Sequence, residues 1–146
     1  MAKEVDYPPV WLAGFAAAGG LIGRIWPIQT EVNLSLGLVL IVLGAALMLI
    51  AVLQMMFART SFIPRRDPDA LVMNGLFRLS RNPIYLGDAL ILTGLYLSWD
   101  ALIALPLVAV FMVVITQRFI LGEEARLLAH FGEAFEAYCA RVRRWI

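Results

Sequence analysis

Long apolar runs dominate the first 57 residues of the chain. One run extends from Val10 to about Ile28 and is interrupted only by Arg24. A second run, from Asn33 to about Phe57, contains no charged residue. A helix that crosses the hydrocarbon core of a bilayer needs about 20 mostly apolar residues. The pattern therefore predicts two transmembrane helices in this part of the chain.

The polarity changes between Arg59 and Asn82. This segment contains five arginines, two aspartates and two prolines, and it has no apolar run long enough to cross a bilayer. Backbone outside a helix needs hydrogen-bond partners from water, protein or a ligand. Long loops in small proteins are often functional. We therefore expect a loop outside the membrane that takes part in a site.

Two shorter apolar runs follow the loop, about Ile84 to Trp99 and about Ala101 to Ile120. The break between them, Ser98-Trp99-Asp100, predicts a helical hairpin in which Asp100 caps the second arm. This hairpin would supply the third and fourth transmembrane helices. Asp88 is the one acid within these runs, and we expect it to face the loop or a polar cavity.

The segment from Gly122 to Ile146 has a different periodicity. Its apolar residues recur at intervals of three or four, which is typical of one face of a helix. The sequence therefore predicts an amphipathic C-terminal helix that lies on the membrane surface or packs over the central loop. The apolar positions are Leu127, Phe131, Phe135, Tyr138 and Val142.

The composition extends this picture to the whole chain. Of the 146 residues, 62% are hydrophobic and only 16% are charged, against about 45–50% and about 25% in soluble domains. The chain is therefore predicted to be an all-α integral membrane protein with about four transmembrane helices. Its length allows one domain, 1–146, with the two N-terminal helices in 1–57 and a second half in 58–146. The N-terminal sequence MAKEVDYPP lacks a basic start, so we expect no cleaved signal peptide.

The positive residues predict an orientation. Arginines concentrate in the central loop and in the C-terminal tail, whereas the link between the first two helices offers only Arg24 and the tip around Asp100 has no base. Positive residues favour the cytoplasmic side. We therefore expect the N-terminus, the central loop and the C-terminus to be cytoplasmic.

Several kinds of chemistry are absent from the sequence. No basic stripe with interleaved aromatic residues is present, so nucleic acid is an unexpected partner. The only cysteine, Cys139, excludes an internal disulfide, and the only histidine, His130, has no metal-ligand spacing around it. Nucleotide-binding glycine fingerprints are also missing. We expect no metal site and no hydrolase triad.

Small residues in the first helix allow close packing against another helix. Gly19 and Gly23 are separated by three residues, a spacing that lets helix backbones approach each other. Packing within the chain is the simpler interpretation. A homodimer through this face is the alternative.

Two polar motifs interrupt the apolar pattern where helices begin. In RNPIYLG, residues 81–87, Asn82 is expected to cap a helix that starts at Pro83. Free amides at a helix start attract carboxylates and phosphates, although a capped helix start needs no ligand. Glu123 and Glu124 suit the start of a helix, and a carboxylate there can also accept hydrogen bonds from a ribose or hold a cation. The hairpin would bring both motifs to one membrane face.

These motifs resemble a known family. The segments ALVMNGLFRLSRNPIYLG and GEEARLLAHFGEAFEAYCARVRRWI are similar to the catalytic half of isoprenylcysteine carboxyl methyltransferases and related phospholipid methyltransferases. In this sequence Asn82 stands where histidine is commoner, as in short bacterial members. The matching positions are Leu71, Val72, Gly75, Phe77, Arg81, Asn82, Pro83, Tyr85, Gly87, Glu123, Glu124, Leu127, Phe131, Gly132, Phe135 and Tyr138.

The resemblance implies a methyltransferase in a bacterial inner membrane that uses S-adenosylmethionine. The acceptor would be a carboxylate, amine or thiol of a lipid or other hydrophobic small molecule. Arg118, Glu123 and Tyr85 would have catalytic roles, with Arg118 meeting the acceptor. The cofactor would be bound by Asp69, Ala70, Leu71, Val72, Gly75, Phe77, Arg81, Asn82, Pro83, Ile84, Tyr85, Glu123 and Glu124.

A second resemblance offers an alternative function. Tyr85-Leu86-Gly87-Asp88 and Tyr138-Cys139 are similar to motifs of membrane sterol reductases, which use NADPH. The Arg-Asn-Pro start and the glutamate pair favour methyl transfer. A membrane scaffold without enzymatic activity would explain the helices, but it gives no reason for both polar motifs.

Overall fold

The computed structural model describes residues 6–146, which form helices and loops without a strand. Helix α1 is Pro8–Ile25, α2 is Asn33–Phe57 and α3 is Pro83–Ser98. A 3-10 turn, Leu102–Ala104, leads into α4, Pro106–Ile115. The C-terminal helices are α5, Leu121–Phe131, and α6, Glu133–Arg141. The expected helices are thus confirmed to within a few residues at most ends, and the bounds of α2 are as predicted.

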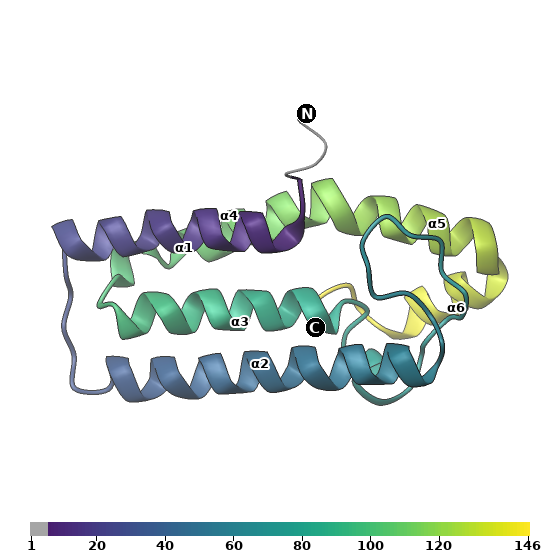
Figure 1. The fold of residues 1–146 in the computed structure, drawn as a ribbon, viewed down its shortest axis with the longest axis horizontal. Helices are drawn as coiled ribbons and strands as arrows, with labels where there is room; N and C mark the ends of the chain where they lie inside the picture. Colours follow the sequence, from purple (N-terminus) through teal and green to yellow (C-terminus); the bar gives the residue numbers. More distant parts are fainter. Residues whose placement is uncertain (1–5) are drawn as a thin grey trace.

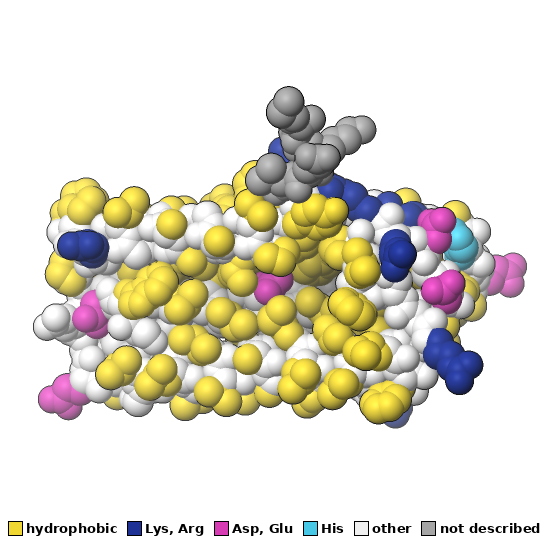
Figure 2. Space-filling model, in the orientation of Figure 1, with side chains coloured by type: hydrophobic (Ala, Val, Ile, Leu, Met, Phe, Trp, Pro, Cys, Tyr) yellow, Lys and Arg dark blue, Asp and Glu magenta, His cyan; other side chains and the backbone are white. Residues whose placement is uncertain are grey.

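The long helices lie side by side, and the polar segments gather at one end (Figure 1). Helix α3 lies between α1 and α2, and α4 packs against both α1 and α3. The loop of residues 58–82, α5 and α6 lie together at the end where α3 begins. Apolar side chains cover the face formed by α1, α3 and α2, whereas charged side chains lie mainly at the two ends (Figure 2).

Two helical stretches in the described residues are long and apolar enough to cross a membrane. They are Asn33–Phe57, and Leu102–Phe131, in which α4 and α5 form one continuous helix. Helix α3 is apolar but has only 16 residues. The architecture is therefore that of a helical membrane protein, while the count of four crossings and the division at residue 57 stay predictions.

Helices α2 and α3 contact each other through four glycines, which we call the glycine seam: Gly37, Gly44, Gly87 and Gly94. A Cβ added to Gly44 would lie 2.6 Å from the carbonyl oxygen of Gly87, and one added to Gly37 would lie 2.6 Å from that of Gly94. The seam repeats every seven residues on each helix, in opposite directions. Such spacing permits backbone-to-backbone packing over two turns of an antiparallel pair.

Helix α1 uses its small residues for packing within the chain. Gly19 faces the ring of Tyr96, and Gly23 faces the backbone around Trp99 and Ala101. Both glycines are buried. The simpler interpretation of the Gly19–Gly23 spacing is therefore confirmed, and a homodimer stays a prediction.

Asp100 does not cap the second arm of the hairpin, contrary to expectation. It adopts a positive φ of 54°, and its carboxylate accepts a hydrogen bond of 3.1 Å from the Asn33 side chain. Its carbonyl oxygen accepts a second bond, of 2.8 Å, from the Ile28 amide. Asp100 therefore joins the tip of the hairpin to the link between α1 and α2.

The prediction of one C-terminal helix from Gly122 to Ile146 is also wrong. The helix ends at Phe131, and α6 starts at Glu133. Gly132 between them has a φ of +49°, which glycine adopts without a steric penalty. The break turns α6 back over the loop, where Phe135 and Tyr138 pack with Val72 and Phe77.

Candidate functional site

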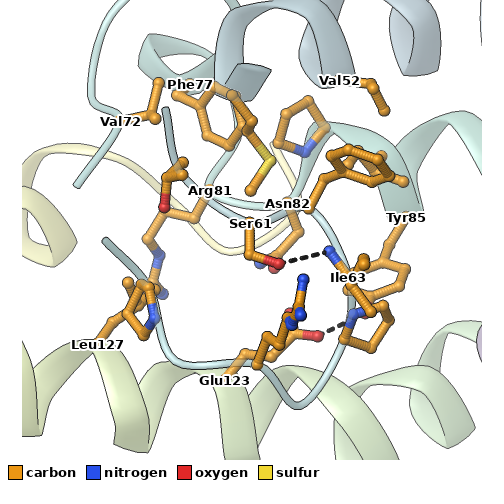
Figure 3. A pocket seen from close by; sticks show the side chains of 18 of the residues that line it. Val52, Ser61, Ile63, Val72, Phe77, Arg81, Asn82, Tyr85, Glu123 and Leu127 are labelled. Carbon is orange, nitrogen blue, oxygen red and sulfur yellow. Dashed lines mark hydrogen bonds between the residues drawn. The ribbon is translucent and has the colours of Figure 1, made fainter. Parts of the chain in front are cut away.

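A cavity of about 470 Å³ lies where the loop, the start of α3 and α5 meet (Figure 3). This volume is within the range of about 300–1,000 Å³ that is usual for small-molecule sites. Helices α2 and α6 and the start of α1 complete the walls. The lining includes Tyr7, Pro8, Pro9, Met48, Val52, Met55, Thr60, Ser61, Phe62, Ile63, Arg65, Arg66, Ala70, Leu71, Val72, Phe77, Arg81, Asn82, Pro83, Ile84, Tyr85, Asp88, Glu123, Glu124, Arg126, Leu127, Phe135 and Tyr138.

The two polar motifs meet in this cavity. The Tyr85 hydroxyl donates a hydrogen bond of 2.7 Å to the Glu123 carboxylate, although 38 residues separate them. Tyr85 is buried, so its hydroxyl needs such a partner. The hairpin therefore brings RNPIYLG and the glutamate pair together, as the sequence predicts.

Glu124 binds Arg81, which lines the cavity, and Arg144 of the C-terminal tail. It accepts two hydrogen bonds from Arg144, of 2.9 and 2.7 Å, and lies 3.3 Å from the Arg81 guanidinium. The hydrogen bond to Glu124 raises the pKa of Arg144. Arg81 also donates a bond of 2.6 Å to the sulfur of Cys139 on α6. Glu124 thus fixes the C-terminal tail against the start of α3.

Asn82 is the residue before α3, but its side chain does not cap the helix. Its amide nitrogen donates a bond of 3.0 Å to the Arg144 carbonyl, and its backbone N–H donates a bond of 3.1 Å to the Ser80 hydroxyl. The capping prediction is therefore wrong. The Asn82 side chain binds the Arg144 carbonyl of the C-terminal tail instead of the amides at the start of α3. Pro83 is the first residue of α3, as predicted.

The loop is held in place by one of its own side chains, Thr60, and by side chains of α2 and α6. The Thr60 hydroxyl accepts bonds of 3.2 Å from the Asp69 and Ala70 amides, and the Gln54 side chain accepts one of 3.1 Å from Leu76. The Tyr138 hydroxyl donates a bond of 2.6 Å to the Phe77 carbonyl. Burial raises the pKa of Tyr138 to about 12, so it stays a neutral donor.

Most of the predicted cofactor residues line the cavity, but three predicted residues do not. Asp69 is exposed, and Gly75 has a φ of +55° in a turn against Gln54. Arg118 lies in a separate surface groove between α1 and α4. Those in the lining are Ala70, Leu71, Val72, Phe77, Arg81, Asn82, Pro83, Ile84, Tyr85, Glu123 and Glu124.

A π-helical turn, Thr116–Ile120, accounts for the position of Arg118. A π-turn contains one residue more than an α-turn, so it changes the register of the side chains on either side of it. Arg118 lies 3.1 Å from the Asp6 carboxylate and 4.9 Å above the Trp11 ring. Glu123, after the turn, faces Tyr85.

Asp6 accepts hydrogen bonds from three elements, and we call this cluster the Asp6 clamp: Asp6, Trp11, Arg65 and Arg118. The Trp11 indole and the Arg65 guanidinium donate to the carboxylate at 2.8 and 2.6 Å. These bonds, with the nearby charges of Arg118 and Arg65, hold the pKa of Asp6 below its usual range. The clamp ties the loop over the cavity to α1 and to the π-turn.

The model of the phospholipid methyltransferase family matches residues 32–134 of the chain. The chain belongs to this family. Searches among curated proteins and among solved structures gave no match. Family membership implies a methyltransferase activity in a membrane protein.

Some residues that line the cavity are not among the site residues predicted from the sequence. Met48, Val52 and Met55 come from the α2 face toward the cavity, and apolar periodicity alone does not distinguish that face from a lipid-facing one. Asp88 could be noticed in the sequence, because it is the one acid in the two apolar runs of the hairpin. Asp88 was expected to face the loop or a polar cavity; it lines the cavity, although most of the lining is apolar.

Proposed function

We propose that this protein transfers a methyl group from S-adenosylmethionine to a lipophilic acceptor at the cavity beside Tyr85 and Glu123. The observation that supports this most is the contact of Tyr85 with Glu123 in a cavity lined by the predicted loop segment. The contact joins the two motifs on which the resemblance depends. The family match supports the reaction class.

The chemistry of the lining fits this cofactor. Leu71, Val72 and Phe77 offer an apolar wall for an adenine ring. The first free amides of α3 and the Arg81 guanidinium suit a carboxylate. Glu123 offers a carboxylate for ribose hydroxyls or for a cationic group. S-adenosylmethionine contains an adenine ring, a ribose, a carboxylate and cationic groups. It also supplies an activated methyl group on its sulfonium.

The protein's contribution to such a reaction is positioning and exclusion of water. The closed loop and the apolar lining remove water from the reacting groups, and the fixed side chains hold them in line. A carboxylate acceptor needs no base, whereas an amine or thiol acceptor must lose a proton. A lipid acceptor would enter from the bilayer at the level of α2 and α3.

We propose an orientation in which the N-terminus, the loop of residues 58–82 and the C-terminal helices face the cytoplasm, with four crossings, in a bacterial inner membrane. The arginines of the loop and tail support this orientation, because they lie at one end of the molecule.

Ligand titration of the detergent-solubilised protein tests the function. We expect S-adenosylhomocysteine, the cofactor without its methyl group, to bind with a dissociation constant on the order of micromolar by calorimetry. NADPH should give no heat of binding. Binding of NADPH alone would instead establish the reductase alternative, and binding of neither ligand to folded protein would favour the scaffold.

Two variants and a control locate the binding site. Glu123→Gln and Tyr85→Ala should weaken binding of S-adenosylhomocysteine, because both residues line the cavity. Glu133→Gln changes an exposed carboxylate of α6 outside the cavity and should bind like the wild type. Unchanged binding in both cavity variants would remove these residues from the cofactor site.

A further inference from the structure

A short segment of the loop covers the cavity, and we call it the strap: residues 61–66. All of its residues line the cavity, next to residues 7–9 at the start of α1. Figure 3 shows the strap side chains Ser61 and Ile63 among those of the lining. The strap has no helix or strand, and its large apolar side chains, Phe62 and Ile63, keep 45% and 44% of their surface exposed. A segment with so few buried contacts can open while the rest of the protein stays folded.

One residue makes the hydrogen bonds between the strap and the rest of the described chain. Arg65 donates a bond of 2.7 Å to the Asp6 carbonyl and one of 2.6 Å to the Asp6 carboxylate. Its guanidinium also lies 5.0 Å from the centre of the Phe119 ring. The other hydrogen bonds of the strap, among the described residues, join its own members. The closed position of the strap therefore depends mainly on the contact of Arg65 with Asp6.

The backbone of Arg65 adds to this dependence. It has a φ of 65°, in the left-handed region that residues with a side chain adopt only at a cost. Such a conformation persists where surrounding contacts offset its cost. The two bonds to Asp6 and the contact with Phe119 are these contacts. Their loss would let the strap relax away from the cavity.

Asp6 is the fixed half of this contact, because two other elements hold it. The Trp11 indole of α1 donates a bond of 2.8 Å to its carboxylate, and the Arg118 guanidinium of the π-turn lies 3.1 Å away. Asp6, Trp11 and Arg118 all line the separate groove between α1 and α4. An opening strap would therefore carry Arg65 away while Asp6 stays in place, so the contact can form again.

The proposed cofactor needs a path that opens and closes. S-adenosylmethionine is charged and comes from water, so the apolar face of the helices offers it no entry. The strap belongs to the loop that gathers with α5 and α6 at one end of the molecule (Figure 1), and most of its residues are exposed. A closed strap would exclude water during methyl transfer, and an open one would release the product.

We propose that the strap is the gate through which the cofactor enters and leaves, and that the contact of Arg65 with Asp6 is its latch. This inference rests on the proposed function, and it describes the regulation of that same site. A weaker latch destabilises the closed strap equally with and without ligand, because Asp6 lies outside the cavity lining. Entry and release would both become faster, and the affinity would hardly change.

Exchange of radiolabelled S-adenosylhomocysteine measures the latch. Asp6→Asn removes the charge that faces Arg65, and we expect the ligand to dissociate about threefold faster or more, since exposed ion pairs contribute modestly. The dissociation constant should change by less than about twofold. Glu133→Gln is the matched control, because it changes an exposed carboxylate of α6 outside the cavity. An unchanged dissociation rate in Asp6→Asn, or a loss of affinity without faster release, would overturn the latch.

Ionic strength gives a second measurement of the latch. Salt screens exposed ion pairs, so a change from about 0.1 M to about 1 M NaCl should accelerate release from the wild type. Release from Asp6→Asn should respond less, because its latch has already lost one charge. A purely structural role of Asp6 would leave both proteins equally sensitive to salt, and that result would refute the latch.

Limited proteolysis separates this inference from the proposed function, because it needs no ligand. Trypsin cleaves after arginine, so cleavage after Arg65 and Arg66 reports the population of the open strap. We expect Asp6→Asn to be cleaved there about threefold faster than the wild type, and Glu133→Gln at the wild-type rate. Equal cleavage of all three proteins would overturn the gate. Faster cleavage of Asp6→Asn, in a protein that does not bind S-adenosylhomocysteine, would refute the methyltransferase proposal and keep the latched strap.

Discussion

Between Gly37 and Gly44, α2 lies against α3 with backbone facing backbone; between Met48 and Met55, the same helix faces a cavity. The first region is a close contact between two helix backbones, with the Ser98 hydroxyl beside Gly37 and the Ile91 side chain beside Gly44. The second region is surrounded by side-chain hydrogen bonds and ion pairs. One part of α2 thus packs closely against α3, and another part of the same helix lines the cavity.

The difference shows where the molecule tolerates change. In the seam, a Cβ added to any of the four glycines would lie within 2.7 Å of a carbonyl oxygen of the facing helix. The two helices would have to move apart to make room for it. Around the cavity, a lost hydrogen bond costs about 0.5–1.5 kcal/mol, and more when it leaves a buried group without a partner. Variants at the seam should therefore lower the stability of the fold, whereas variants at the cavity should mainly change its ligand binding.

The largest effect is expected at the seam. Gly44→Ala would place a methyl group 2.6 Å from the Gly87 carbonyl oxygen, so we expect a loss of about 1–3 kcal/mol in the free energy of unfolding. Gly14→Ala is the control, because no atom lies within 4 Å of its added Cβ. That variant should be stabilised by up to about 1 kcal/mol, because alanine favours a helix more than glycine does. Denaturant unfolding measures both, and similar stabilities would disprove the close contact.

The next largest effect concerns the contact of Tyr85 with Glu123. Tyr85→Phe leaves the Glu123 carboxylate without its 2.7 Å donor, and we expect a loss of about 1–3 kcal/mol in stability. A double-mutant cycle with Glu123→Ala, which removes the acceptor, isolates the pairwise energy. Strictly additive losses in the cycle would show that the two side chains do not interact.

The sequence predicts the elements well because their signal is local. A charge-free run predicts α2 with the bounds that the structure gives, and Pro83 predicts the start of α3. The meeting of RNPIYLG with the glutamates follows from the hairpin. Asp88 could be noticed for the same reason, since a lone acid in an apolar run is visible without a structure.

The features that the sequence does not predict depend on partners that are distant along the chain. The glycines of α2 and α3 gain their meaning only when the antiparallel pairing places Gly44 on Gly87 and Gly37 on Gly94. Asn82 looks like a cap until the tail supplies the Arg144 carbonyl. The resemblance implies that Arg118 meets the acceptor, and the π-turn that places Arg118 in a separate groove has no sequence signal that we recognise.

A smaller effect is expected where the tail meets Glu124. Arg144→Lys keeps the charge but loses the two parallel hydrogen bonds, because a lysine ammonium cannot match both carboxylate oxygens. Since Arg144 is partly exposed, we expect a loss of only about 0.5–1 kcal/mol. Hydrogen exchange should show faster exchange at the Arg81 amide, which bonds to the Arg143 carbonyl. Unchanged exchange there would mean that the tail is held by other contacts.

The smallest effect should come from the Asp6 clamp, and it depends on pH. The pKa of Asp6 is lower in the folded state than in the unfolded chain, so its ionised form stabilises the fold above the unfolded value. That contribution is lost as the pH falls through the lowered pKa. The melting temperatures of wild type and Asp6→Asn should differ slightly at pH 7 and converge once the pH has fallen below the lowered pKa of Asp6. A difference that persists at acid pH would exclude the carboxylate as its cause.

The π-turn has a consequence for how the gene can change. Each residue of an α-helix turns the chain by about 100°, so the loss of one codon within Thr116–Ile120 would restore regular winding. Either Glu123 would then rotate away from Tyr85, or the buried residues of α4 would rotate out of the core. Point mutations in this stretch exchange side chains and leave the register intact. The geometry of this site is therefore far more sensitive to the deletion of a residue in this stretch than to the substitution of one.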